Sequence, residues 1–245
     1  PDGHTIMLVE SGSHAIAPNA LVGGTGYDPV GDFTPIAVVG TGPLVLVVNN
    51  DFPARTAEEF VQRVRAAKPE DYAYATSGVG TPNHLATEML ALSLNTRWVH
   101  VPFRSGGQQV QAIHQGQGQF GIAVLASTAG QLRSGLVRGL ALTGASRFPA
   151  FPDLPTLAES GVPGFDMETF NVIIGPPNMP APVVSALNRA IVAALAEQPL
   201  REKLIGAGVA PRADSNAPDD ARAFLMRENE KFRDAVQRTG VRLER

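Results

Sequence analysis

Short apolar runs alternate with amphipathic stretches along most of the chain. Polar or glycine-containing segments bound these runs, which have the length of β-strands. We expect strands over residues 5–9, 34–39, 43–48, 72–75, 97–101, 119–125, 139–143 and 173–175. The polar segment 10–14 is expected to form a turn, and Gly40-Thr41-Gly42 to separate two strands.

Helices are predicted between most of these strands, because apolar residues recur there at spacings of three and four. Thr56 and Glu59 have the spacing of a capping box. Thr81 is a natural N-cap, and Pro82 follows it at the first helical position. The apolar stripes are Phe60, Val61 and Val64; Leu85, Met89 and Leu92; Val110 and Ile113; Val184, Leu187, Ile191 and Leu195; and Phe224, Leu225, Phe232 and Val236.

The alternation of strands and helices predicts an α/β fold with mostly parallel sheets flanked by helices. Glycines and prolines gather near residues 47–53 and again near 143–155, which indicates two places where the chain crosses between lobes. We therefore expect residues 47–142 to form one continuous lobe. Residues 1–46 and 143–245 would form the other, discontinuous lobe.

Composition excludes several classes of function. The chain has 245 residues, of which 44% are hydrophobic, enough for the cores of two lobes. A net charge of −3 without a long Lys/Arg run argues against a nucleic-acid partner. No apolar stretch approaches the ~18 residues of a membrane span, so no direct membrane insertion is expected. The absence of cysteine excludes disulfides, thiol catalysis and thiolate metal sites.

The segment Ser77-Gly78-Val79-Gly80-Thr81-Pro82 is the most informative local pattern. A strand that ends in glycines and enters a capped helix directs main-chain N–H groups and the positive end of the helix dipole at one spot. The hydroxyls of Ser77 and Thr81 could add donors, so a carboxylate or phosphate could bind without a charged side chain. An ordinary β–α turn, in which Thr81 only caps the helix, explains the same residues equally well.

Two further polar strand ends could face the same cleft, because ligands of open α/β sheets bind beyond the carboxyl ends of strands. One is Ser11-Gly12-Ser13-His14. The other is the turn over residues 102–107, which contains Arg104 and Ser105. Arg104 could contact a carboxylate through two N–H groups. Taken alone, it is more simply a solvated surface charge.

Catalytic and metal-binding patterns are missing. There is no Gly-x-Ser-x-Gly or His-Glu-x-x-His, and the five histidines lack metal-ligand spacing, so we expect no catalytic residues, no metal and no cofactor. His84 could donate to a bound anion, although a structural helix histidine is the simpler interpretation. Asn171 could offer its amide to a ligand or satisfy a loop backbone, and the sequence favours neither.

The ordered set of motifs resembles the Bug/TctC family, the extracytoplasmic receptors of tripartite tricarboxylate transporters. The resemblance covers nearly the whole chain. The matching stretches are Pro1-Asp2-Gly3-His4-Thr5; Tyr27-Asp28-Pro29-Val30-Gly31-Asp32-Phe33; Tyr74 to Thr81 with His84 and Glu88; His100-Val101-Pro102-Phe103; Phe151-Pro152-Asp153-Leu154-Pro155-Thr156; Gly161-Val162-Pro163-Gly164; and Pro180-Ala181-Pro182.

This resemblance implies a two-lobed periplasmic-binding-protein fold of type II, with the ligand cleft between the lobes. It implies a periplasmic monomer that binds a small carboxylated solute and delivers it to the membrane permease subunits of a tripartite transporter. The family's binding positions carry over onto Ser77, Gly78, Gly80 and Thr81, and onto the Ser11–His14 turn of the other lobe. The full set of expected ligand contacts is Ser77, Gly78, Gly80, Thr81, His84, Ser11, Ser13, Arg104, Ser105, Phe170 and Asn171.

Two departures from the family pattern limit what can be carried over. A first β–α unit with a Pro-Gly-Gly-Gly loop has no counterpart, so the chain is expected to start after it, and a signal peptide is not visible. The strand end that often carries a polar residue reads Ala123-Val124, which suggests a less polar wall. A solute sensor acting through a signalling partner and, less simply, an α/β hydrolase-like enzyme are the alternative functions.

Overall fold

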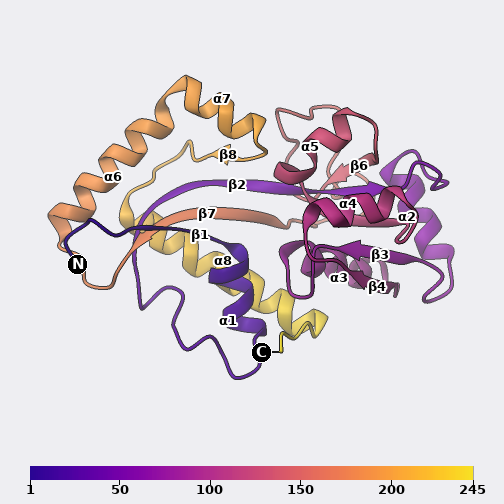
Figure 1. Cartoon of the computed structure of the whole chain (residues 1–245), viewed down its shortest axis with the longest axis horizontal. Helices are drawn as coiled ribbons and strands as arrows, with labels where there is room; N and C mark the ends of the chain where they lie inside the picture. Colours follow the sequence, from indigo (N-terminus) through magenta and orange to yellow (C-terminus); the bar gives the residue numbers. More distant parts are fainter. Residues whose placement is uncertain (245) are drawn as a thin grey trace. The chain divides into compact units, whose positions relative to one another are not determined.

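The computed structural model describes residues 1–244, which divide into two compact units (Figure 1). Unit 1 comprises Pro1–Thr41 and the segment from Thr169 onward, and unit 2 is the continuous segment Gly42–Glu168. The sequence-based bounds placed 143–168 in the discontinuous lobe. This segment instead packs within unit 2, where the N–H of Thr143 donates to the carbonyl of Leu44 over 3.0 Å.

Unit 1 combines strands from both ends of the chain with helices of its C-terminal part. Its elements are β1 (Met7–Glu10), the π-helix η1 (Gly12–Ile16), α1 (Ala17–Ala20), the first part of β2 (Thr34–Val48), β7 (Glu168–Gly175), α6 (Ala181–Ala196), α7 (Gln198–Gly206), β8 (Ala210–Pro211) and α8 (Pro218–Thr239). β1 pairs antiparallel with β7, and β8 pairs antiparallel with β2. No helix within residues 1–244 is long and apolar enough to cross a membrane.

Unit 2 is a mixed sheet flanked by helices. Its elements are the second part of β2, α2 (Ala57–Ala66), β3 (Ala73–Thr76), α3 (Pro82–Leu94), β4 (Val99–Pro102), α4 (Gly106–His114), β5 (Phe120–Val124), α5 (Leu125–Arg133) and β6 (Arg138–Leu142). β3 pairs parallel with β4 and β5, as expected, whereas β2 pairs antiparallel with β5 and β6. Phe60, Tyr74 and Phe120 lie fully buried in its core.

β2 is one uninterrupted strand, so the expected break at Gly40-Thr41-Gly42 is wrong (Figure 1). Gly40 pairs with Pro211 of β8. A Cβ atom on Gly40 would lie 2.2 Å from the carbonyl oxygen of Ala210. The glycine therefore permits a close approach of two backbones, which is a second common reason for glycine inside a strand.

Gly40→Ala is expected to lower the free energy of unfolding by about 2 kcal/mol, because the added methyl group must displace β8. Urea unfolding followed by circular dichroism would measure the change. Gly130→Ala is the matched control, since its Cβ meets no atom within 4 Å and the site lies inside α5. Alanine should raise stability there through its helix propensity. Equal effects of both substitutions would contradict the packing explanation.

The segment 10–14 is also not the simple turn that was expected, because η1 begins at Gly12. The carboxylate of Glu10 accepts hydrogen bonds from the N–H groups of Gly12 (2.9 Å) and Ser13 (3.0 Å). A side-chain oxygen that accepts from first-turn N–H groups stabilises a helix start. The glycine and serines that indicated a turn are therefore held in a helical conformation by Glu10.

Candidate functional site

Three strand ends of unit 2 meet at one edge of its sheet. β3, β4 and β5 run parallel, and each leads into the N-terminus of a helix, namely α3, α4 and α5. The loops after them are adjacent: a Cβ atom on Gly78 would lie 3.5 Å from the carbonyl oxygen of Phe103, and one on Gly106 would lie 3.1 Å from Oγ of Ser127. Three helix N-termini at one edge favour an anion there.

The loop between β3 and α3 adopts a conformation that its two glycines make possible. Gly78 and Gly80 have φ angles of 138° and 70°. The N–H of Gly78 donates to Oγ1 of Thr76 (3.2 Å), and that of Gly80 donates to Nδ1 of His84 (3.0 Å). Val79 between them has a half-exposed side chain, and its N–H has no hydrogen-bond partner within residues 1–244.

Asn83 organises this loop from inside, and sequence reasoning did not identify it. Its side chain is buried, and Oδ1 accepts hydrogen bonds from Oγ of Ser77 (3.1 Å) and from the N–H of His84 (3.0 Å). Oγ1 of Thr81 also contacts this oxygen and donates to the carbonyl of Gly78 (2.7 Å). Both hydroxyls that were expected to face a ligand are thus engaged with the loop itself.

Thr81 occupies the N-cap position of α3, as expected, but its side chain forms no capping hydrogen bond. Its hydroxyl is directed to Gly78 and Asn83. The oxygen that accepts the N–H of His84 in the first turn belongs to Asn83 instead. The side-chain oxygen of Asn83, a residue inside α3, therefore accepts a first-turn N–H of this helix. The usual capping pattern does not reveal such a role.

Gln109 of α4 holds Asn83 in place. Nδ2 of Asn83 donates to Oε1 of Gln109 (2.7 Å). Nε2 of Gln109 donates in turn to the carbonyls of Ala75 in β3 (2.9 Å) and Ile122 in β5 (2.8 Å). All atoms of this chain of hydrogen bonds are buried and satisfied, so it fixes the loop to the sheet rigidly.

His84 is buried beneath the loop rather than presented at its surface. Its ring stacks on that of His100, with centroids 4.1 Å apart and planes 9° apart. Burial, reinforced by the neighbouring His100, lowers the pKa of His84 to about 4. Nε2 of His84 lies 3.9 Å from Oε1 of Glu88, which also accepts a hydrogen bond from the hydroxyl of Tyr74.

The other expected contacts of unit 2 have distinct surroundings. Arg104 is exposed and forms no ion pair within residues 1–244. It lines a cavity of about 440 Å³ beside α4, together with Phe103 and Gln108. Oγ of Ser105 accepts the N–H of Gln108 (3.3 Å) and so caps α4. Arg104 is therefore available to a ligand, whereas the hydroxyl of Ser105 is used to cap α4.

The residues of unit 1 that were expected to contact a ligand are buried or form hydrogen bonds within unit 1. Ser11 is fully buried, and its Oγ lacks a partner within residues 1–244. Oγ of Ser13 donates to the carbonyl of Glu10 over 3.1 Å. Nε2 of His14 is likewise buried and without a partner in the described part of the chain. Two neighbouring polar atoms in this helical turn thus remain unsatisfied.

Phe170, expected at a ligand, is a core residue of unit 1 and is only 1% exposed. Its ring packs edge-on against Phe224 and Phe232 of α8. Because side chains alternate along a strand, the next residue points to the other face of β7. That residue, Asn171, is half-buried and pairs with Glu10 of β1. The aromatic residue in this motif therefore contributes packing to unit 1.

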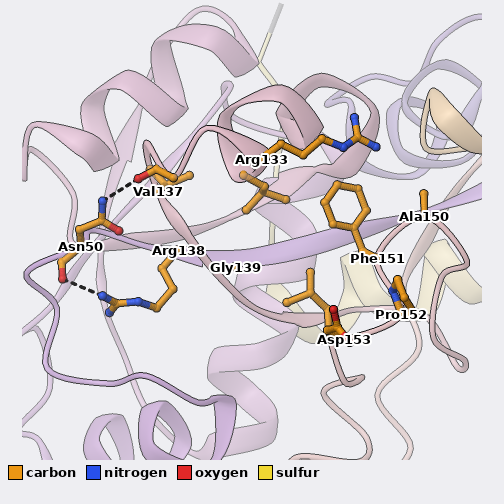
Figure 2. A pocket seen from close by; sticks show the side chains of 12 residues that line it. Asn50, Arg133, Val137, Arg138, Gly139, Ala150, Phe151, Pro152 and Asp153 are labelled. Atoms are coloured by element: carbon orange, nitrogen blue, oxygen red, sulfur yellow. Dashed lines mark hydrogen bonds between the residues drawn. The ribbon is translucent and has the colours of Figure 1, made fainter.

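A separate cavity of about 520 Å³ lies on unit 2 between α5, β6 and the loop after them (Figure 2). The guanidinium group of Arg133 lies 5.0 Å from the centre of the Phe151 ring. Arg138 donates to the carbonyl of Asn50 over 3.1 Å. None of the expected ligand contacts lines this cavity, so it does not belong to the site at the sheet edge.

Comparison with protein families gives one match over residues 1–241, to the tripartite tricarboxylate transporter family receptor. Protein BugT of Bordetella pertussis is 28% identical over 242 residues, which are 99% of this chain and 73% of BugT. A UPF0065 protein of Pseudomonas sp. strain P51, from the tcbD-tcbE intergenic region, is 30% identical over 96% of this chain and 69% of its own length.

Solved structures of similar proteins have the same fold. Rpa4515 of R. palustris, determined with adipate, has a TM-score of 0.87 at 27% identity, covering 98% of this chain and 79% of its own. MatC of Rhodopseudomonas palustris, with bound malate, has a TM-score of 0.81 at 29% identity, covering 96% and 80%. The periplasmic binding protein BugD has a TM-score of 0.84 at 26% identity, covering 100% and 81%. These similarities confirm the two-lobed α/β fold class.

Proposed function

Because the chain belongs to the tripartite tricarboxylate transporter receptor family, we propose that it binds a small carboxylate and passes it to the membrane subunits of a tripartite transporter. The similar proteins whose structures hold adipate and malate support a carboxylate as the ligand. The observation that carries the proposal is the meeting of three helix N-termini at one edge of the unit 2 sheet.

The loop 77–81 is the part of this edge that we assign to a ligand carboxylate. The N–H groups of Gly78 and Gly80 are engaged within the protein, whereas that of Val79 is not. A carboxylate oxygen would accept this N–H at the positive end of α3. Arg104 is exposed on the adjacent loop and is the charged side chain suited to a second contact.

Within unit 1, the proposed ligand contacts are Ser11, Ser13 and Asn171 on β7. The buried, unpartnered hydroxyl of Ser11 supports a polar contact in this segment. We propose in addition that the protein acts in the periplasm, since BugD is described as a periplasmic binding protein, and that it is a monomer. Size-exclusion chromatography with light scattering tests the monomer.

Ligand binding is expected to raise the melting temperature. A bound acid at 100 times its Kd stabilises the folded state by about 2.7 kcal/mol. Thermal melts with a panel of mono- and dicarboxylates, including adipate and malate, should show such a shift for at least one acid. The neutral amide of the same acid is the control and should cause no shift. A panel without any shift would contradict the proposed function.

Val79→Pro tests the assignment of the loop, because proline has no N–H to donate. We expect a loss of affinity of at least about tenfold for the acid found in the melts, as for one charge-assisted hydrogen bond. Val79→Ala is the matched control, since it shortens the side chain and keeps the N–H, and it should bind within about threefold of the unchanged protein. Isothermal titration calorimetry measures both. Equal affinities of the two variants would exclude the Val79 N–H as a ligand contact.

A further inference from the structure

Both glycines of the loop are held by histidine side chains, one directly and one through a hydroxyl. The N–H of Gly80 donates to Nδ1 of His84 over 3.0 Å. The N–H of Gly78 donates to Oγ1 of Thr76 over 3.2 Å, and this oxygen lies 2.7 Å from Nε2 of His100. The Val79 N–H, which we assign to the ligand, lies between these two anchored positions.

The hydrogen bonds define the protonation state of the rings. Nδ1 of His84 accepts an N–H, so it carries no proton, and the ring proton of the neutral form is on Nε2, towards Glu88. The hydroxyl of Thr76 has one proton and faces His100 at a shorter distance than the carbonyl of Gly78 (2.7 against 3.4 Å). Nε2 of His100 accepts the Thr76 proton in one tautomer and donates to Oγ1 in the other, and in both it fixes this oxygen. The hydrogen bond from Gly80 to His84 is lost when the His84 ring is doubly protonated, because Nδ1 then carries a proton.

The surroundings favour these neutral rings. The two imidazoles stack at 4.1 Å, and the ring of Tyr74 stacks on His100 at 4.9 Å. Burial lowers the pKa of His100 as well as that of His84. Glu88 is the acidic group that faces His84, and it is engaged by the hydroxyl of Tyr74. Stacked aromatic rings of other residues would fill this space equally well, so packing alone does not require acceptor nitrogens.

We propose that His84 and His100 are positioning residues for the ligand: two stacked, uncharged rings that fix Gly80 and, through Thr76, Gly78, and thereby present the Val79 N–H to a carboxylate. This inference rests on the proposed function of the loop. It gives His84 a role other than direct donation to an anion, because Nδ1 accepts from the backbone and the protonated Nε2 lies towards Glu88.

Two substitutions at each position separate the acceptor from the ring. His84→Phe keeps a flat ring in the stack but removes Nδ1, whereas His84→Asn places an amide oxygen near the position of Nδ1. His100→Phe and His100→Gln make the same comparison for Nε2. Isothermal titration calorimetry would give the Kd for the acid found in the melts, and hydrogen exchange without ligand would report the protection of the Gly80 amide.

We expect His84→Phe to weaken binding by about tenfold, the effect of one lost hydrogen bond, and to increase exchange at Gly80. His84→Asn should bind within about threefold of the unchanged protein. The His100 pair should follow the same order, and it tests the proposal even if His84→Phe does not fold. Similar affinities of the phenylalanine and amide variants, at position 84 or at position 100, would overturn the proposal.

The outcome is distinguishable from failure of the proposed function. If the unchanged protein binds no carboxylate, the function itself is wrong. If it binds one and His84→Phe binds equally well, with unchanged exchange at Gly80, only the positioning role is wrong.

Discussion

Asn83→Ala is expected to lower the free energy of unfolding by about 3 kcal/mol and to abolish measurable carboxylate binding. The substitution removes the oxygen that accepts from Ser77 and from the N–H of His84. It also leaves Oε1 of the fully buried Gln109 without its donor. A buried polar group that loses its partner costs about 1–3 kcal/mol. Two such groups are affected here, the N–H of His84 and Oε1 of Gln109. Urea unfolding measures the stability, and calorimetry measures the binding.

Asn83→Asp is the control for this prediction. It keeps the acceptor oxygen for Ser77 and His84, and its negative charge lies at the positive end of α3. It removes the donor to Gln109. We expect it to retain more stability than Asn83→Ala and to reject a ligand carboxylate through charge repulsion. A loss below about 1 kcal/mol for Asn83→Ala would show that the loop is held by other contacts.

Acidification from pH 7 to pH 4 should destabilise the protein by roughly 3 kcal/mol through His84 alone. The pKa of this histidine is about 4 in the folded protein, against 6.5 for the ordinary side chain. Between these values the unfolded chain binds more protons, so stability is complete above pH 6.5 and is lost as the pH falls towards 4. Burial lowers the pKa values of His14 and His100 as well, which adds to the loss in the same direction.

Urea unfolding at several pH values between 7 and 4 would measure this dependence. His84→Phe removes the titrating group and should reduce the slope over that range. A slope that is the same in the unchanged protein and in His84→Phe would mean that His84 does not control acid stability.

Local sequence signals predicted much of the secondary structure of unit 2. The N-cap of α2 is an example: Oγ1 of Thr56 accepts the N–H of Glu59 over 3.2 Å, and the helix extends over Ala57–Ala66 as its apolar stripe indicated. The carboxylate of Glu59 accepts the N–H of Arg55 and not that of Thr56, so only half of the capping box forms. The start of α3 at Pro82 was also predicted correctly. These features depend on residues within one helical turn, so a single sequence contains the information.

Features that depend on distant segments were missed. Gly40 was interpreted as a break because its close neighbour, Ala210, is remote in the sequence. Asn83 and Gln109 look like ordinary helix residues, and only the packing of α3 and α4 on one sheet brings their amides together. The motif that contains Phe170 is compatible with a ligand contact or with a core contact. Its packing against Phe224 and Phe232 of α8 joins segments that are distant in the sequence.

The course of the chain through the two units also has a kinetic consequence. Unit 2 is one continuous segment, so every strand that pairs with β3 or β5 is available once Glu168 has been synthesised. In unit 1, by contrast, β1 pairs with β7, and η1 packs against α8 near the end of the chain. Domains fold as units during synthesis, and closing a long loop is slow. Unit 2 should therefore fold on the ribosome first, while the N-terminal segment of unit 1 stays incomplete until α8 has been synthesised.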